Sequence, residues 1–244
     1  MLKTLAIVPA RIGSKGVPKK NLINIGNFSL VERALFTAIK TKSIQKILVS
    51  TDSENIKNLV NKYGDYAPFL RPKKLSTDKA KSLDVIKHSL LWAEKNYNEE
   101  YNYIALIEPP CPFRLPAHID IAIDIIIEKK ATSVVSLIEV GDFHPIRMKK
   151  ILPNGMLKGV MEDEPDGLRR QDQSPVYIRN SAVYVFDKKT ILRDKLWGSQ
   201  PHGFIMDKNL YYINIDEPID LEYARLFYNK MKKKNQLDLI ESII

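Results

Sequence analysis

The sequence predicts an α/β protein built on an open, mostly parallel sheet with helices on both faces, a three-layer arrangement. Apolar strand patterns and helical patterns alternate over the first 140 residues, which is the order of β-α-β units. The run of residues 103–107, Tyr-Ile-Ala-Leu-Ile, is apolar without interruption, as expected of a central strand that is buried on both faces. The chain has 244 residues, of which 44% are apolar, enough for one large domain. We expect a single domain over residues 1–244.

The expected elements follow one another along the chain. Short apolar runs predict strands, and apolar residues three and four positions apart predict helices. The expected strands are 5–8, 47–49, 103–107, 133–140, 182–186 and 210–213, and the expected helices lie over 30–39, 56–63, 85–93, 119–127 and 218–233.

Residues 141–180 break this alternation. They are polar, and their prolines are Pro145, Pro153, Pro165 and Pro175. Proline removes a backbone donor and disfavours both helix interiors and central strands. We therefore expect these residues to leave the main sheet as a β-rich flap, a dimerisation arm, or both.

The composition excludes several classes of protein. Cys111 is the single cysteine, so no internal disulfide framework can form, which fits a reducing cytoplasm. No stretch approaches the roughly 18 apolar residues of a membrane span, and the short apolar run before Pro9 is no signal peptide. The net charge of +9 is mostly lysine spread along the chain, without the interleaved aromatic residues of a nucleic-acid platform. We expect a cytoplasmic protein that binds neither membrane nor nucleic acid.

A basic, glycine-containing loop follows the first expected strand. Residues 9–21 read Pro-Ala-Arg-Ile-Gly-Ser-Lys-Gly-Val-Pro-Lys-Lys-Asn. Glycines let backbone N–H groups approach phosphates, and cations balance the phosphate charge. The loop also lies at the carboxyl end of a strand, where open α/β sheets bind ligands. The sequence therefore predicts a polyphosphate site, although such a loop can also be a solvated turn.

Six segments, taken in order, resemble the acylneuraminate cytidylyltransferase family, also called CMP-sialic acid synthetases. They are residues 9–21, 49–52, 71–78, 108–114, 169–172 and 214–216, and the resemblance runs from about residue 3 to residue 228. It implies one α/β domain of the nucleotide-diphospho-sugar transferase type, usually a homodimer. It further implies a reaction in which CTP and Mg2+ activate a nine-carbon 2-keto sugar acid and pyrophosphate is released.

The resemblance also implies roles for individual residues. The nucleotide-binding residues would be Arg11, Gly13, Ser14, Lys15, Lys20, Asn21, Arg71 and Ser82. The sugar-binding residues would be Glu108, Arg147, Arg170, Asn180 and Tyr184. Asp216, Asn214 and Glu108 would hold the metal, and Arg11, Lys20 and Asp216 would act in catalysis.

Three positions depart from the family pattern. Asn214 stands where the family has the first aspartate of an Asp-x-Asp metal motif, and Ser181 replaces a glycine. Glu108 stands where the family usually has glutamine. Glu108 either restores the charge missing at Asn214 or contacts a different sugar, and the sequence leaves both readings open. Asp52, by contrast, is interpreted as part of a helix start rather than of the site.

Three alternative functions also stay open. The substrate could be an eight-carbon octulosonate or its amino form, or the chain could bind nucleotide without turnover, as the loss of a carboxylate at Asn214 suggests. The basic charge alone would favour a nucleic-acid-binding protein.

Overall fold

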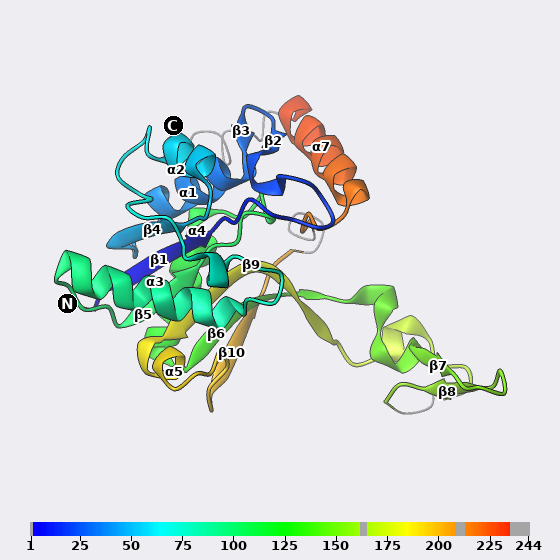
Figure 1. The fold of residues 1–244 in the computed structure, drawn as a ribbon. Helices are drawn as coiled ribbons and strands as arrows, with labels where there is room; N and C mark the ends of the chain where they lie inside the picture. The colour runs from blue at the N-terminus through cyan, green and yellow to red at the C-terminus, as the bar shows by residue number, and fades with distance from the viewer. Residues whose placement is uncertain (1, 162–164, 208–212, 235–244) are drawn as a thin grey trace.

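The computed structural model describes residues 2–161, 165–207 and 213–234, and its centre is a six-stranded sheet (Figure 1). The strand order is β10-β6-β9-β5-β1-β4. The bounds are β1 Thr4–Pro9, β4 Lys46–Ser50, β5 Tyr103–Leu106, β6 Ser133–Glu139, β9 Tyr177–Asp187 and β10 Pro201–Ile205. The strands pair in parallel except at β9, which runs antiparallel to both β5 and β6. The predicted α/β fold with a mostly parallel sheet is confirmed.

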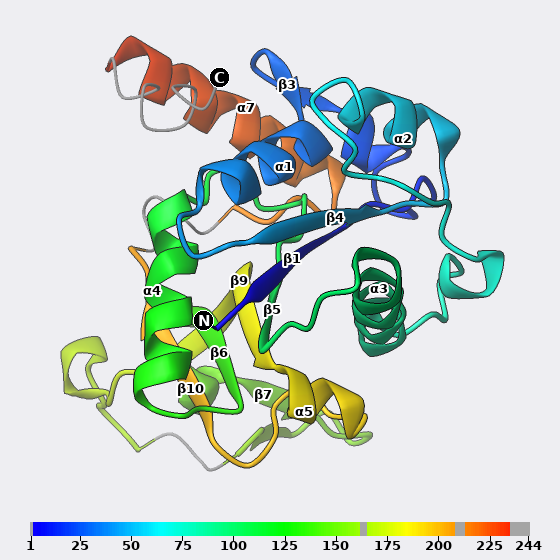
Figure 2. The same ribbon diagram turned by 90° about the vertical axis from the view of Figure 1, so that its left-hand side faces the viewer.

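Helices cover both faces of this sheet, so the fold has three layers (Figure 2). One face packs against α1 Leu30–Lys40, α2 Glu54–Val60 and α4 Pro116–Glu128, and the other against α3 Ser82–Tyr97 and α5 Lys188–Leu192. Side chains of a strand alternate between faces. In β1, Ala6 and Val8 therefore join the α1 side while Leu5 and Ile7 join the α3 side.

A third apolar cluster lies at one end of the sheet, under helix α7 Pro218–Lys233. It joins Val17 of the basic loop and Ile25 of the hairpin β2 Asn24–Ile25 and β3 Phe28–Ser29 to Ile215 and Tyr228. At Gly26, φ is +66° and a Cβ would meet the Tyr228 ring at 2.1 Å, so the hairpin turn needs glycine. This cluster brings residues near the two ends of the chain together.

Between β6 and β9 the chain leaves the sheet as the predicted β-rich excursion. It contains the hairpin β7 Lys149–Ile151 and β8 Leu157–Gly159 and the short 3-10 helices η3 Gly141–Phe143, η4 Pro145–Arg147 and η5 Arg170–Asp172. The hairpin projects away from the main sheet (Figure 1).

Several expected elements differ from those observed. β9 begins at Tyr177, before the expected 182–186, because its first residues pair with the end of β6. β10 was missed because Pro201 and Gly203 disfavour strands, yet the strand pairs at the sheet edge, where proline is tolerated. α2 ends at Val60, before the predicted 63, and the Tyr63 hydroxyl instead donates to Glu32 at 2.8 Å.

The strand expected at 210–213 lies mostly outside the described residues. Within the part of the chain that the structure describes, no helix has the length and apolar character needed to cross a bilayer.

Candidate active site

A cavity of about 260 Å³ opens at the carboxyl ends of β1 and β5. The structure brings most of the predicted nucleotide-binding residues to its walls, together with Glu108. These lining residues are Arg11, Gly13, Ser14, Lys20, Asn21, Arg71, Ser82 and Glu108. The cavity also contacts the first turn of α3, where free backbone N–H groups and the helix dipole favour acceptors and anions.

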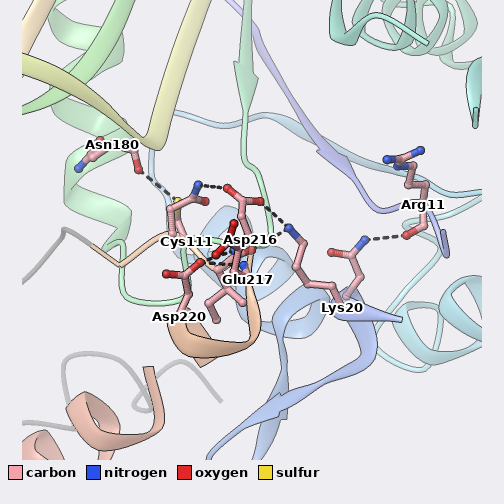
Figure 3. A network of polar contacts seen from close by, with 10 residues as sticks. Arg11, Lys20, Cys111, Asn180, Asp216, Glu217 and Asp220 are labelled. Carbon is pink, nitrogen blue, oxygen red and sulfur yellow. Dashed lines mark hydrogen bonds and ion pairs between the residues drawn. The ribbon is translucent and has the colours of Figure 1, made fainter. Parts of the chain in front are cut away.

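The basic loop is tied to the segment that precedes α7 (Figure 3). Lys20 Nζ donates to the Ile215 carbonyl at 2.7 Å and forms an ion pair with Asp216 Oδ1 at 2.8 Å. A Cβ at Gly16 would lie 2.0 Å from the backbone oxygen of Asp216, so the backbones of these two segments are in direct contact. Asn21 Nδ2 donates to the Arg11 carbonyl at 2.8 Å and braces the loop internally. The cations of the loop and the carboxylate of Asp216 thereby share one site.

Asp52 supports the same loop from the end of β4. Its Oδ1 accepts a hydrogen bond from the backbone N–H of Ile12 at 2.9 Å. The next residue, Ser53, caps α2 by accepting from Ile56 N at 3.4 Å, which confirms the predicted helix start. The loop contact of Asp52 joins segments 40 residues apart, and no local pattern in the sequence indicates it.

Arg71 is buried and braces one wall of the cavity. Its Nη2 donates to the Ser50 carbonyl at 2.7 Å, and its own backbone N–H donates to Thr51 at 2.7 Å. Burial lowers the pKa of Arg71 to about 10; the Asp52 carboxylate opposes the shift, and the charge of Arg11 adds to it. The Arg71 guanidinium is therefore fixed beside the cavity, still charged at neutral pH.

The Asp78 carboxylate lines the cavity and pairs with two cations of the loop. It lies 2.8 Å from Arg11 Nη1 and 3.2 Å from Lys15 Nζ. Hydrogen bonds from Arg11 and Lys15 lower the pKa of Asp78 below its usual range. The resemblance placed residues 71–78 at the nucleotide but gave Asp78 no role of its own. Arg11 and Asp78 are 67 residues apart, so no local sequence pattern indicates their contact. The contact places a carboxylate beside the cations that are predicted to bind phosphate.

Asp216 lies between Lys20 and Cys111 in a network of polar contacts (Figure 3). Asn214 Nδ2 donates to Asp216 Oδ2 at 2.6 Å, so both carboxylate oxygens of Asp216 are engaged. Asn214 Oδ1 accepts from Cys111 Sγ at 3.4 Å. Among the described residues, no three His, Cys, Asp or Glu side chains are grouped to hold a metal ion. Metal ligation by Asp216, Asn214 and Glu108 therefore stays a prediction.

Glu108 is half-buried, and no salt bridge to a described residue neutralises it. Burial raises the pKa of Glu108; the charge of Arg114 opposes the shift, and that of Asp216 adds to it. Arg114 is itself buried and donates to the Glu108 carbonyl and, at 2.7 Å, to the carbonyl of Ala182. Arg114 was not predicted. It fixes the end of β5 to β9 and so sets the position of Glu108.

The predicted sugar-binding residues separate into two groups. Asn180 and Tyr184 lie on β9 near Glu108, and both are buried. Asn180 Oδ1 accepts from Ser136 Oγ at 2.6 Å, a bond within the core. Arg147 lies on the excursion in η4, 3.6 Å from Asp142, and Arg170 begins η5. Arg147 is not among the described residues that line the cavity.

Comparisons with known proteins show which family the chain belongs to. The chain is 31% identical to the N-acylneuraminate cytidylyltransferase of Escherichia coli O18:K1:H7 over 99% of its own length and 55% of that protein. It thus spans about half the length of that relative. The CMP-N,N'-diacetyllegionaminic acid synthase of Legionella pneumophila is 29% identical over 90% of this chain and 93% of that protein.

The fold is shared with the solved structure of CMP:2-keto-3-deoxy-manno-octonic acid synthetase complexed with CTP. The TM-score is 0.69 at 14% identity, over 93% of this chain and 99% of that one. The family model described as cytidylyltransferase matches residues 5–241. The chain therefore belongs to the cytidylyltransferase family.

Proposed function

We propose that the protein transfers CMP from CTP to the anomeric hydroxyl of a 2-keto-3-deoxy sugar acid and releases pyrophosphate. The observation that carries this proposal is one cavity in which the basic loop, Arg71 and the first turn of α3 meet Glu108, with Asp216 held at its edge by Lys20. The names of the relatives support the same reaction, and they favour a nonulosonate such as sialic or legionaminic acid.

In this reaction the sugar hydroxyl oxygen attacks the α-phosphorus of CTP. The bond from that phosphorus to the pyrophosphate oxygen breaks, and the hydroxyl proton leaves to solvent or base. The protein chiefly aligns the reactants and stabilises negative charge. Arg11, Lys15 and Lys20 supply positive charge around the triphosphate. Gly13, Ser14 and Asn21 are neutral contacts. Arg71 and Ser82, which also line the cavity, would contact the nucleoside.

Mg2+ fits the donors at the edge of this cavity. Asp216, Asn214 and Glu108 offer oxygen atoms, which a hard cation prefers. Burial is the main reason that the pKa of Glu108 is raised, and Asp216 raises it further, so a divalent cation would offset two neighbouring carboxylates. Bound Mg2+ supplies charge neutralisation to the phosphates. Lys20 and Asn214 each donate to one carboxylate oxygen of Asp216, which fixes the orientation in which Asp216 would meet the cation.

The protein is proposed to act as a homodimer joined through the excursion. The excursion exposes more large apolar side chains than a monomer usually does. They are Phe143, Met148, Ile151, Met156, Leu157 and Met161. A second copy is the occupant we favour, because it would cover this apolar surface and could bring Arg147 to a partner's pocket. We expect Ile151→Lys to shift the mass measured by light scattering toward the monomer. Leu91→Lys, on α3, is the control.

The proposed reaction is tested by measuring pyrophosphate after incubation with CTP, Mg2+ and a panel of keto acids. Release with a nonulosonate is expected, and release with none of the acids contradicts the proposal. Turnover restricted to octulosonates would move the substrate to the eight-carbon class. CTP binding without release would indicate a nucleotide-binding homologue, and DNA binding that survives physiological salt would revive a nucleic-acid role. We expect the enzyme in the cytoplasm, where CTP is made.

The role of Glu108 is tested separately by Glu108→Gln. If Glu108 compensates for Asn214, the variant needs a higher Mg2+ concentration for half-maximal rate. An unchanged Mg2+ requirement with an altered preference among the acids would instead assign Glu108 to the sugar.

A further inference from the structure

Ser181 has a left-handed backbone in the middle of a strand. Its φ is +59°, and the strand β9 runs from Tyr177 to Asp187. The other described non-glycine residues with positive φ lie at or next to the ends of helices or 3-10 helices: Lys19, Asn98, Lys130 and Asp194. A left-handed conformation costs an ordinary residue free energy, and such residues gather where function repays the cost. Ser181 is thus an unusual choice at a position that suits glycine.

The strain lies at a bulge between β6 and β9. The pairing shifts between Val135 opposite Tyr184 and Leu137 opposite Arg179, so residues 180–183 face the single residue Ser136. Bulges of this kind re-aim side chains, often beside active sites.

Neighbouring contacts hold the bulge in place. Val183 N donates to Ser136 Oγ at 2.9 Å, and Arg114 Nη1 donates to the Ala182 carbonyl at 2.7 Å. The Cys111 thiol shares its one proton between the Asn180 carbonyl, 3.3 Å from Sγ, and Asn214 Oδ1. The conformation at Ser181 is therefore imposed by its surroundings and does not depend on the serine side chain.

The Ser181 hydroxyl lies between two parts of the site. Its Oγ accepts a long hydrogen bond from the Tyr184 hydroxyl at 3.3 Å. Tyr184 pairs with Leu106, a residue of the nucleotide cavity wall, and Glu108 follows two residues later, just after the end of β5.

On its other side, Ser181 lines a second cavity of about 240 Å³ with Arg179, Asn214 and Tyr223. Asn214 links this cavity to Asp216 and Lys20. Ser181 thus stands where the acceptor side of the site meets the charged network.

We propose that Ser181 is a positioning residue for the sugar acid. Its hydroxyl, fixed by the left-handed backbone, holds the phenol of Tyr184 toward the acceptor beside Glu108. The inference rests on the proposed function and refines it: the serine side chain tunes recognition of the sugar acid and leaves CTP binding untouched.

The test compares Ser181→Gly with Ser181→Ala. Glycine keeps the bulge, removes the hydroxyl and relieves the strain, so Tm should rise by about 2–4 °C. Alanine removes the hydroxyl but keeps the strain, so Tm should not rise. Both variants should raise KM for the acid by about 3- to 10-fold, the worth of one neutral hydrogen bond, with KM for CTP unchanged. In a Tyr184→Phe background, Ser181→Gly should add no further increase.

The possible outcomes separate this inference from the proposed function. Wild-type protein that releases no pyrophosphate with any acid overturns both. If wild type turns over, an unchanged KM for the acid in Ser181→Gly overturns the role of Ser181 alone. A raised KM for the acid in Ser181→Gly but not in Ser181→Ala also overturns the role of the Ser181 hydroxyl, because the freer backbone of glycine would then be the cause. An additive effect with Tyr184→Phe overturns positioning through Tyr184.

Discussion

Gly16→Ala tests whether the basic loop must touch the Asp216 segment for activity. A Cβ at position 16 would lie 2.0 Å from the backbone oxygen of Asp216, whereas ordinary contacts begin at 3.4 Å, so one segment must move by about 1.4 Å (3.4 − 2.0). The Asp216 oxygen is a backbone atom and the added Cβ is bonded to the backbone, so rotation of a side chain cannot relieve the clash. Lys20 and Asp216 are carried by the two segments that separate. Because a misplacement of about 1 Å can cost about 100-fold in rate, we expect kcat/KM to fall by about 100-fold.

The assay is initial-rate pyrophosphate release, with urea denaturation as the measure of folding. Overpacking of this kind lowers the free energy of unfolding by about 1–3 kcal/mol, so the variant should stay folded. Gly13→Ala is the control for folding, since a Cβ there meets nothing within 4 Å. A Gly16→Ala enzyme that keeps kcat/KM within about twofold of wild type would refute the reasoning, because the loop would then not need the contact with Asp216.

Three further predictions concern single side chains. Lys20→Met removes the charge that pairs with Asp216 and should lower kcat by about 100- to 1000-fold, whereas Lys19→Met, at an exposed position, should change it little. Burial lowers the pKa of His118 to about 4, and its neutral Nδ1 accepts from Leu115 N at 3.0 Å. As pH drops from about 6.5 to 4, His118 becomes protonated in the unfolded chain but stays neutral in the folded protein. The free energy of unfolding should therefore fall by at most about 3 kcal/mol over this range. Urea titrations across that window should show this loss in wild type and not in His118→Gln. Burial raises the pKa of Cys111 to about 12, so iodoacetamide at about pH 8 should label it, by mass spectrometry, only after unfolding; rapid labelling of native protein would contradict its burial.

The sequence predicted the fold class and the nucleotide side of the site because their signals are local. The basic loop is one contiguous segment, and apolar periodicity is a property of neighbouring residues. The antiparallel direction of β9 was beyond prediction, since strand pairing depends on partners far away in sequence. The same holds for Asp52, Asp78 and Arg114, each of which acts across a long sequence separation or through a backbone carbonyl.

The acceptor side of the site is also only partly predictable. Asn180 and Tyr184 were assigned to the sugar site by resemblance, and that assignment stays a prediction. The left-handed conformation of Ser181 arises from a bulge in the pairing of β6 with β9, which local residue types do not indicate. Arg147 and Arg170 were assigned by resemblance, and they belong to η4 and η5 of the excursion instead of the main sheet.

The ion pairs of Asp78 change what a visiting anion gains at the basic loop. In the free protein, Arg11 and Lys15 already have a counterion, so any incoming anion must exchange with a carboxylate instead of meeting bare charge. A monoanion would replace one negative charge with another and gain little. An anion with several charges would gain more from the same exchange. For a chain with a net charge of +9, this built-in counterion disfavours monoanions at the basic loop and leaves it open to polyanions.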